Sequence, residues 1–146
     1  MRILGLVMLV GLSGVAAFGQ VVAPAASPVL AEAKVYTVAE MPVRKMANGG
    51  ESRDVLRGVL PTGEAVGVHE STQVVGAVPN PPHKIDHSEI ITVIEGTLSF
   101  EHDGKSEKVG PGGVIFVAMG TMHTVKNVGD VPAKYVVVQI GGDTKK

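Results

Sequence analysis

The chain contains no cysteine, no tryptophan and few aromatic residues, and these shortages exclude several kinds of site. Without cysteine there is neither a disulfide framework nor a thiolate metal centre, so a bound metal must be held by histidine and carboxylate ligands. Aromatic residues make up only 3% of the sequence, which disfavours a surface on which sugars or nucleic-acid bases stack.

The chain also lacks an excess of charge of either sign. Its formal net charge is −1, and no basic run is longer than two residues. We therefore expect no nucleic-acid partner and no anionic membrane surface as a partner. A length of 146 residues with 45% apolar residues predicts one domain with a substantial core.

Residues 1–19 have the composition of a secretory signal peptide. Arg2 precedes an apolar run, Ile3–Val10, and small residues lead to an expected cleavage between Gly19 and Gln20. The run is short and interrupted by glycine, so an uncleaved membrane anchor is the weaker alternative. We expect a secreted or periplasmic protein that has no membrane contact after cleavage.

The remaining chain is rich in short β-branched segments separated by turn residues. Residues 20–34 suggest a flexible lead-in, residues 35–142 one β domain, and residues 143–146 a polar tail. Ten segments are strand candidates: Val35–Val38, Asp54–Leu60, Glu64–Glu70, Thr72–Val78, Glu89–Ile94, Thr97–His102, Lys105–Val109, Val114–Ala118, His123–Asn127 and Lys134–Ile140. Asp103-Gly104 predicts a tight hairpin, and no helical period is present. The pattern is typical of an all-β barrel or sandwich.

Histidine and glutamate residues gather in two stretches that begin or flank predicted strands. His87 and Glu89 have the same strand parity and can converge on one ion, whereas His83 reaches it only if the chain bends at residues 84–86. His123 comes from another strand, as a three-dimensional coordination shell requires. A mixed nitrogen and oxygen set suits one divalent transition metal, namely Fe, Mn, Zn, Ni or Cu.

These stretches resemble the two motifs of the cupin superfamily. In the first motif, G-x5-H-x-H-x3,4-E-x6-G, His83, Glu89 and Gly96 match, whereas Ile85 replaces the second histidine and Ala77 the first glycine. In the second, G-x5-P-x-G-x2-H-x3-N, Gly112, Gly120, His123 and Asn127 match and Ala118 replaces the proline. The resemblance implies a double-stranded β-helix, or jelly-roll barrel, a homodimer, and metal ligation by His83, Glu89 and His123.

The role of the remaining candidates is open at this stage. We hypothesise that His87 supplies the imidazole missing at Ile85, with a supporting or surface position as the alternatives. His69 and Phe116 are candidates to line the pocket, although an ordinary strand position explains His69 and core packing explains Phe116 equally well. We expect His102 to be solvated and Asn127 to stabilise a turn.

Three functions are compatible with these residues. The first is a metal-dependent enzyme, with dioxygenase- or isomerase-like chemistry on a small molecule. The second is a barrel that binds a small ligand or a metal without turnover. The third is a structural barrel with a degenerate site, which Ile85 favours. The fold alone does not select among them.

Overall fold

The computed structural model describes residues 27–142 as nine strands and one short 3₁₀ helix. In chain order they are η1 (Val38–Glu40), β1 (Val43–Lys45), β2 (Glu51–Val59), β3 (Ala65–Gln73), β4 (Ser88–Glu95), β5 (Leu98–His102), β6 (Lys105–Val109), β7 (Val114–Val117), β8 (His123–Asn127) and β9 (Ala133–Ile140). Within this range no helix has the length and hydropathy that a membrane crossing needs. The predicted signal peptide and polar tail lie outside the described residues.

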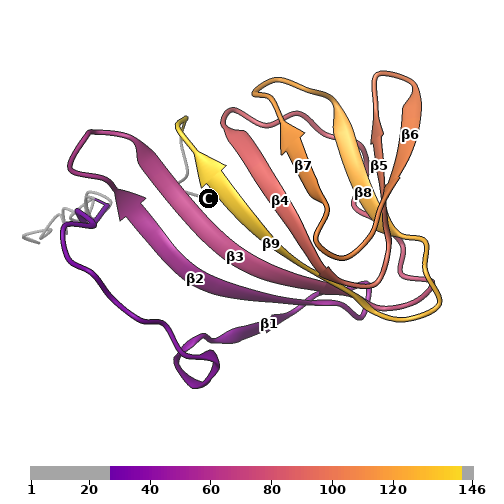
Figure 1. Cartoon of the computed structure of the whole chain (residues 1–146), viewed down its shortest axis with the longest axis horizontal. Coiled ribbons are helices and arrows are strands. Elements are labelled where there is room, and N and C mark those ends of the chain that lie inside the picture. The colour runs from indigo at the N-terminus through magenta and orange to yellow at the C-terminus, as the bar shows by residue number, and fades with distance from the viewer. Residues whose placement is uncertain (1–26, 143–146) are drawn as a thin grey trace, which may run out of the picture.

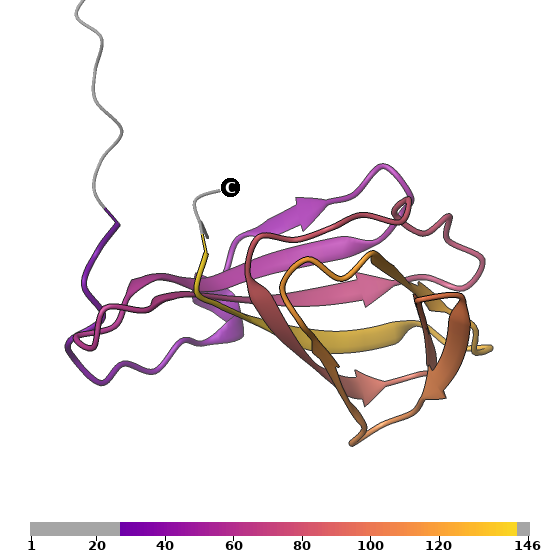
Figure 2. The same cartoon turned by 90° about the horizontal axis from the view of Figure 1, so that it is seen from above.

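The strands form two antiparallel sheets. The larger has the order β1-β2-β3-β9-β4-β7 and the smaller the order β6-β5-β8. The last strand, β9, therefore lies between β3 and β4, as Figure 1 shows. Figure 2 shows the smaller sheet folded over one part of the larger sheet. The expected all-β fold with antiparallel sheets is confirmed.

An apolar core fills the space between the sheets. Its buried members come from β4, β5, β7 and β9 and include Ile91, Val93, Leu98, Val117 and Val137. Burial alternates along β4 and β7 because successive side chains of a strand point to opposite faces of the sheet. Leu98 and Val117 are fully buried, so apolar packing largely closes this half of the barrel to solvent.

The turn residues act as their chemistry predicts. Asp103 and Gly104 have φ values of 47° and 73°, as a type I′ hairpin between β5 and β6 requires. Regular pairing ends with β3 at Gln73, and the proline-rich residues 79–82 stay outside the sheets, because proline cannot donate a backbone hydrogen bond to a sheet. The chain then returns to the sheet at His83, which forms an isolated antiparallel bridge with His123.

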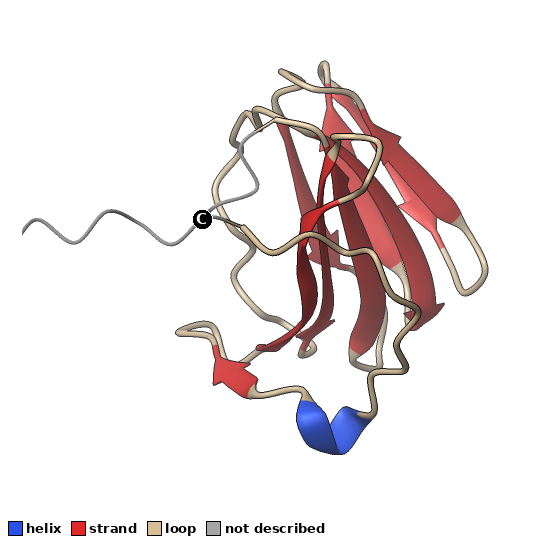
Figure 3. Cartoon of the chain, turned by 90° about the vertical axis from the view of Figure 1, so that its left-hand side faces the viewer, coloured by secondary structure: helices blue, strands red, loops and turns tan. Residues whose placement is uncertain are grey.

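Two of the sequence predictions differ from the structure in the N-terminal half. Val35–Val38 is not a strand, and the edge strand is β1, which begins at Val43. The segment Thr72–Val78 is not a separate strand, because β3 continues to Gln73 and a turn follows. Residues 28–30 of the expected lead-in bond to the end of β2, where Val59 donates to Pro28 and accepts from Leu30. Figure 3 shows η1 followed by β1 at the margin of the large sheet.

Candidate functional site

The register of the large sheet aligns polar side chains on its inner face. Residues directly opposite one another in an antiparallel pair share a face. Glu89 of β4 lies opposite Gln139 of β9, which in turn lies opposite Gly67 of β3. Two residues further along β3, His69 lies opposite Val137. Glu89, Gln139 and His69 therefore make this part of the inner face polar.

A cavity of about 290 Å³ opens at this polar part of the face. Five of the six residues proposed from the sequence line it: His69, His83, His87, Glu89 and His123. Phe116 does not: its side chain is 64% exposed on the outer face of β7, while Ile115 and Val117 point inward. The expectation that Phe116 lines the pocket is thus wrong, because β7 is apolar at every position and only the register decides which residues face the core.

His83 and His123 form a pair across the cavity wall. Their backbones exchange two hydrogen bonds of 3.0 Å, and their ring centroids are 4.8 Å apart. In each ring Nδ1 donates to a backbone carbonyl at 3.1 Å, that of Pro81 for His83 and that of Thr121 for His123. A neutral imidazole that donates from Nδ1 has its lone pair on Nε2. Both rings are thus held in the tautomer that a metal ligand adopts.

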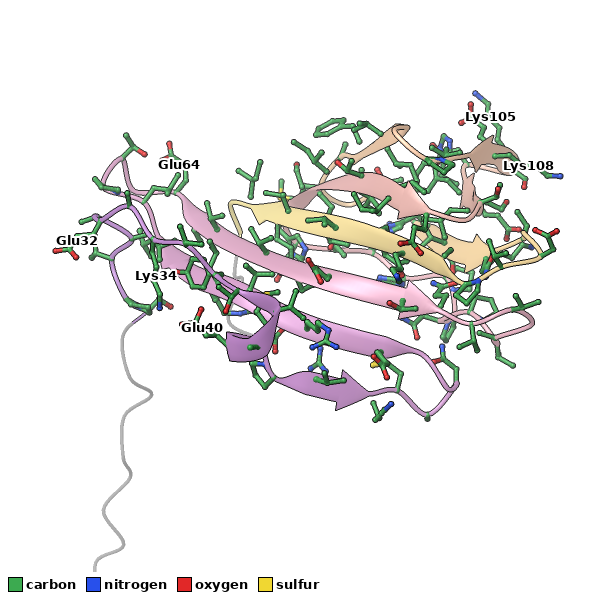
Figure 4. All side chains as sticks on the ribbon, turned by 60° about the horizontal axis from the view of Figure 1, so that its bottom comes forward. Glu32, Lys34, Glu40, Glu64, Lys105 and Lys108 are labelled. Atoms are coloured by element: carbon green, nitrogen blue, oxygen red, sulfur yellow. The ribbon has the colours of Figure 1, made fainter. Side chains whose placement is uncertain are left out.

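Glu89 lies between His87 and His123. Its Oε1 is 3.0 Å from Nε2 of His87, and its Oε2 is 3.9 Å from Nε2 of His123. The Glu89 residue is only 8% exposed, unlike surface carboxylates such as Glu32 and Glu64, which project into solvent (Figure 4). Burial of a carboxylate is unfavourable unless it is hydrogen-bonded or bound to a cation. The carboxylate of Glu89 is therefore the group in the cavity that most needs a hydrogen-bond donor or a cation.

Gln139 is a member of this cluster that the sequence analysis did not identify. Its side-chain nitrogen lies 3.1 Å from Oε1 of Glu89 and 3.0 Å from Nε2 of His87. Asp86 accepts from the other ring nitrogen of His87 at 3.1 Å. A polar residue at the inward parity of the apolar strand Tyr135–Ile140 was the available signal, but only the pairing of β9 with β4 brings it to Glu89.

These donors fit a metal in their chemistry. Two ligands about 2.1 Å from one ion and at a right angle to each other lie about 3 Å apart, which is the separation of His87 and Glu89. The distance from Glu89 to His123 is wider, and within residues 27–142 no three His, Asp or Glu side chains are already close enough to form a complete metal site. Binding an ion would therefore require His83, Glu89 and His123 to draw together.

Ile85 lies at the position where the family motif has a histidine. Its side chain lines the cavity and packs against the core, and its carbonyl accepts from the backbone of Gly120 at 2.9 Å. His87 lines the same cavity and is 8% exposed. His83 and Glu89 line the same cavity, as the bend expected between them would allow. His87 lies beside Glu89, as their shared strand parity predicted. The ligand role of His87 stays a prediction.

His69 lines the cavity wall on β3. Burial lowers its pKa below the ordinary histidine value, and the carboxylates of Glu89 and Asp54 oppose that shift only in part. A histidine of lowered pKa is neutral near pH 7, so it can accept a proton or a hydrogen bond there. This is the property that a general base or a ligand-binding group would use.

A second polar network, centred on Gln73, adjoins the cavity. Gln73 donates to the hydroxyl of Tyr135 at 3.0 Å, and its carbonyl groups receive hydrogen bonds from Asn127. Burial raises the pKa of Tyr135, so this phenol stays protonated. Asn127 also accepts from Gly129, which confirms its predicted role in a turn. His102 lies outside the cavity, partly buried rather than fully solvated, between Glu107 and Asp103.

Comparison with known proteins found one matching family and many solved structures of similar fold. Residues 69–139 match the model of the "Cupin domain" family. No curated protein matches the chain significantly. Many solved structures match its fold, and three with TM-scores of 0.60 or more are described below.

The first is an RmlC-like cupin from Shewanella frigidimarina NCIMB 400, with TM-score 0.62 and 15% identity over 77% of this chain and 95% of that chain. KdgF from Halomonas sp. has TM-score 0.64 and 18% identity over 77% and 97%. The polyketide cyclase RemF from Streptomyces resistomycificus has TM-score 0.60 and 17% identity over 79% and 88%. At these identities the likeness shows the fold alone, which is the double-stranded β-helix expected from the motifs.

The family match over residues 69–139 and the likeness in fold both support membership of the cupin superfamily.

Proposed function

We propose that this cupin binds one divalent transition metal and acts on a small molecule in the cavity. The observation that carries the proposal is the His83, Glu89 and His123 arrangement: two imidazoles with Nε2 available, and a buried carboxylate 3.9 Å from one of them. His87 is the fourth donor in this proposal. A metal at these donors would supply Lewis-acid or redox chemistry at positions that the protein leaves open.

The protein's own groups would orient the donors and shape the site. The carbonyls of Pro81 and Thr121 hold the imidazole rings of His83 and His123, and Gln139 holds the carboxylate of Glu89. Ile85 and the core beneath it exclude water from one side of the cavity. His69, neutral at pH 7, is the group available to take a proton from a bound molecule. Metal identity and the reaction, dioxygenase- or isomerase-like, are open within this proposal.

A second candidate is a barrel that binds a small ligand without metal or turnover. It is favoured by the hydrogen bonding of the cavity: in the described part of the chain, no buried side-chain nitrogen or oxygen lacks a partner. Glu89 is already hydrogen-bonded by Gln139, and the aliphatic Ile85 removes one imidazole of the family motif.

Elemental analysis by mass spectrometry separates the two candidates. The sample is protein expressed from Gln20 without a histidine tag. The proposal predicts close to one equivalent of one transition metal, lost in His83→Ala and His123→Ala and reduced in His87→Ala. His102→Ala is the matched control, because His102 lies outside the cavity, and it should keep its metal. Absence of metal even after reconstitution with Fe, Mn, Zn, Ni and Cu would refute the metal proposal and favour the metal-free barrel.

A further inference from the structure

Arg44 of β1 stands at the mouth of the cavity. It lies opposite Ser52 of β2 in the sheet register, and its guanidinium donates to the Ser52 hydroxyl at 3.3 Å. Ser52 is 5% exposed and lines the cavity, so Arg44 is on the inner face of the sheet. The strand β1 lies outside residues 69–139, which match the family model.

Among residues 27–142, Arg44 is the only lysine or arginine that lines this cavity. Glu51, a carboxylate that also lines the cavity, is already paired with Lys45. Within residues 27–142, no salt bridge joins Arg44 to a carboxylate. Its guanidinium thus retains donors for a ligand, and guanidinium groups bind carboxylates through two parallel hydrogen bonds.

A row of hydroxyl groups leads inward from Arg44. Ser52 lies opposite Ser71 of β3, and Ser71 lies opposite Tyr135 of β9. All three line the cavity, and His69 adjoins them two residues before Ser71. Hydroxyl and imidazole groups can each donate or accept, so this wall matches a ligand with several hydroxyl groups.

The cavity volume limits the size of that ligand. Pockets for drug-sized molecules occupy about 300–1,000 Å³, and this cavity, of about 290 Å³, is just below that range. A ligand smaller than a typical drug molecule is therefore the appropriate size. A larger ligand would have to extend past Arg44 into solvent.

We propose that the cavity binds a small hydroxylated carboxylate, whose acid group is held by Arg44 and whose hydroxyl groups meet the row formed by Ser52, Ser71 and Tyr135. The inference deepens the proposed function by naming its ligand class, and it rests on that function for any turnover. Binding of the acid and of a divalent metal in the same cavity would strengthen each other, because the metal offsets the charge of Glu89 that repels an anion.

Binding to D-gluconate and D-glucitol tests the proposal, because the two probes differ chiefly in the carboxylate. Acetate and L-lactate are included as smaller acids. We expect gluconate to raise the melting temperature and to bind in calorimetry, with glucitol at least 10-fold weaker. Arg44→Gln should weaken gluconate binding at least 10-fold, whereas Arg44→Lys, which keeps the charge but not the fork, should lose less.

Arg53→Gln is the matched control. Arg53 follows Ser52 on β2, points to the opposite face and bonds to the Met41 carbonyl. It should bind gluconate as the wild type does. The proposal is overturned if none of the three acids binds at 10 mM, if glucitol binds as tightly as gluconate, or if Arg44→Gln binds gluconate normally.

Metal content measured on the same samples keeps the two proposals apart. If the protein contains no metal but gluconate binding depends on Arg44, the ligand class stands and the metal-dependent function fails. If metal is present and lost in His83→Ala but gluconate binding does not depend on Arg44, the function stands and the ligand class fails. Arg44→Gln itself should keep the metal content of the wild type.

Discussion

Replacing Gln139 with leucine tests whether the buried carboxylate of Glu89 depends on its hydrogen bonds. Gln139 donates to Glu89 at 3.1 Å and lies 3.0 Å from the ring nitrogen of His87. Both partners are 8% exposed, so water cannot freely replace the lost amide. Leucine is apolar, branched at Cγ and comparable to glutamine in volume, so the substitution removes the amide with a modest change in size.

The expected loss follows from the burial of Glu89. A hydrogen bond to a charged group contributes about 1.5–3 kcal/mol to stability, and a buried acceptor that loses its donor retains its full desolvation cost. Partial burial of the leucine offsets some of this loss, so we expect a decrease of about 2 kcal/mol in the free energy of unfolding. Urea unfolding of metal-free protein, followed by circular dichroism, measures it.

Lys134→Leu provides the control on the same strand. Lys134 also donates from β9 to a β4 carboxylate, that of Glu95, at 3.0 Å, but both side chains are about half exposed. Exposed pairs contribute about 0–1 kcal/mol. Gln139→Leu should thus cost clearly more than Lys134→Leu. A difference below about 0.5 kcal/mol would mean that Glu89 is solvated or rearranges, and the description of the site as buried would be wrong.

Further predictions concern the surface and the chain termini. Hydrogen bonds that the His102 ring donates to Glu107, and then to Asp103, raise the pKa of His102. Its contribution to stability is present below the ordinary histidine pKa of about 6.5 and is lost as the pH rises through the raised value. An NMR titration should therefore give a pKa above the ordinary value in the wild type and a lower one in Glu107→Gln, and an equal pKa in both would exclude the Glu107 contact. The full chain should be exported and cut before Gln20, which N-terminal sequencing of the processed protein tests. The mature protein should be a dimer in light scattering, and a monomer would remove that prediction.

The strands were predictable because their signals are local. Asp103-Gly104 and the alternation around it specify the β5-β6 hairpin without any distant partner. The prediction of the edge strand was wrong. Val35–Val38 is β-branched but has no strand to pair with, and β1 forms instead at Val43–Lys45, opposite Glu51–Arg53. Strand propensity alone does not form a strand, because the backbone must find a hydrogen-bonding neighbour.

The candidate site divides in the same way. His83, Glu89 and His123 could be proposed from the sequence because they match the spacing of the two motifs. His87 could be proposed because it has the same strand parity as Glu89. Which side of β7 faces the core could not, since Phe116 and Ile115 are both apolar and only pairing with Ile90 and Ile91 of β4 separates them. Gln139 and Arg44 were missed for a related reason. Each is an ordinary polar residue in its own strand. Gln139 joins the site only because β9 pairs with the distant β4, and Arg44 only because the register of β1 with β2 turns it toward the cavity.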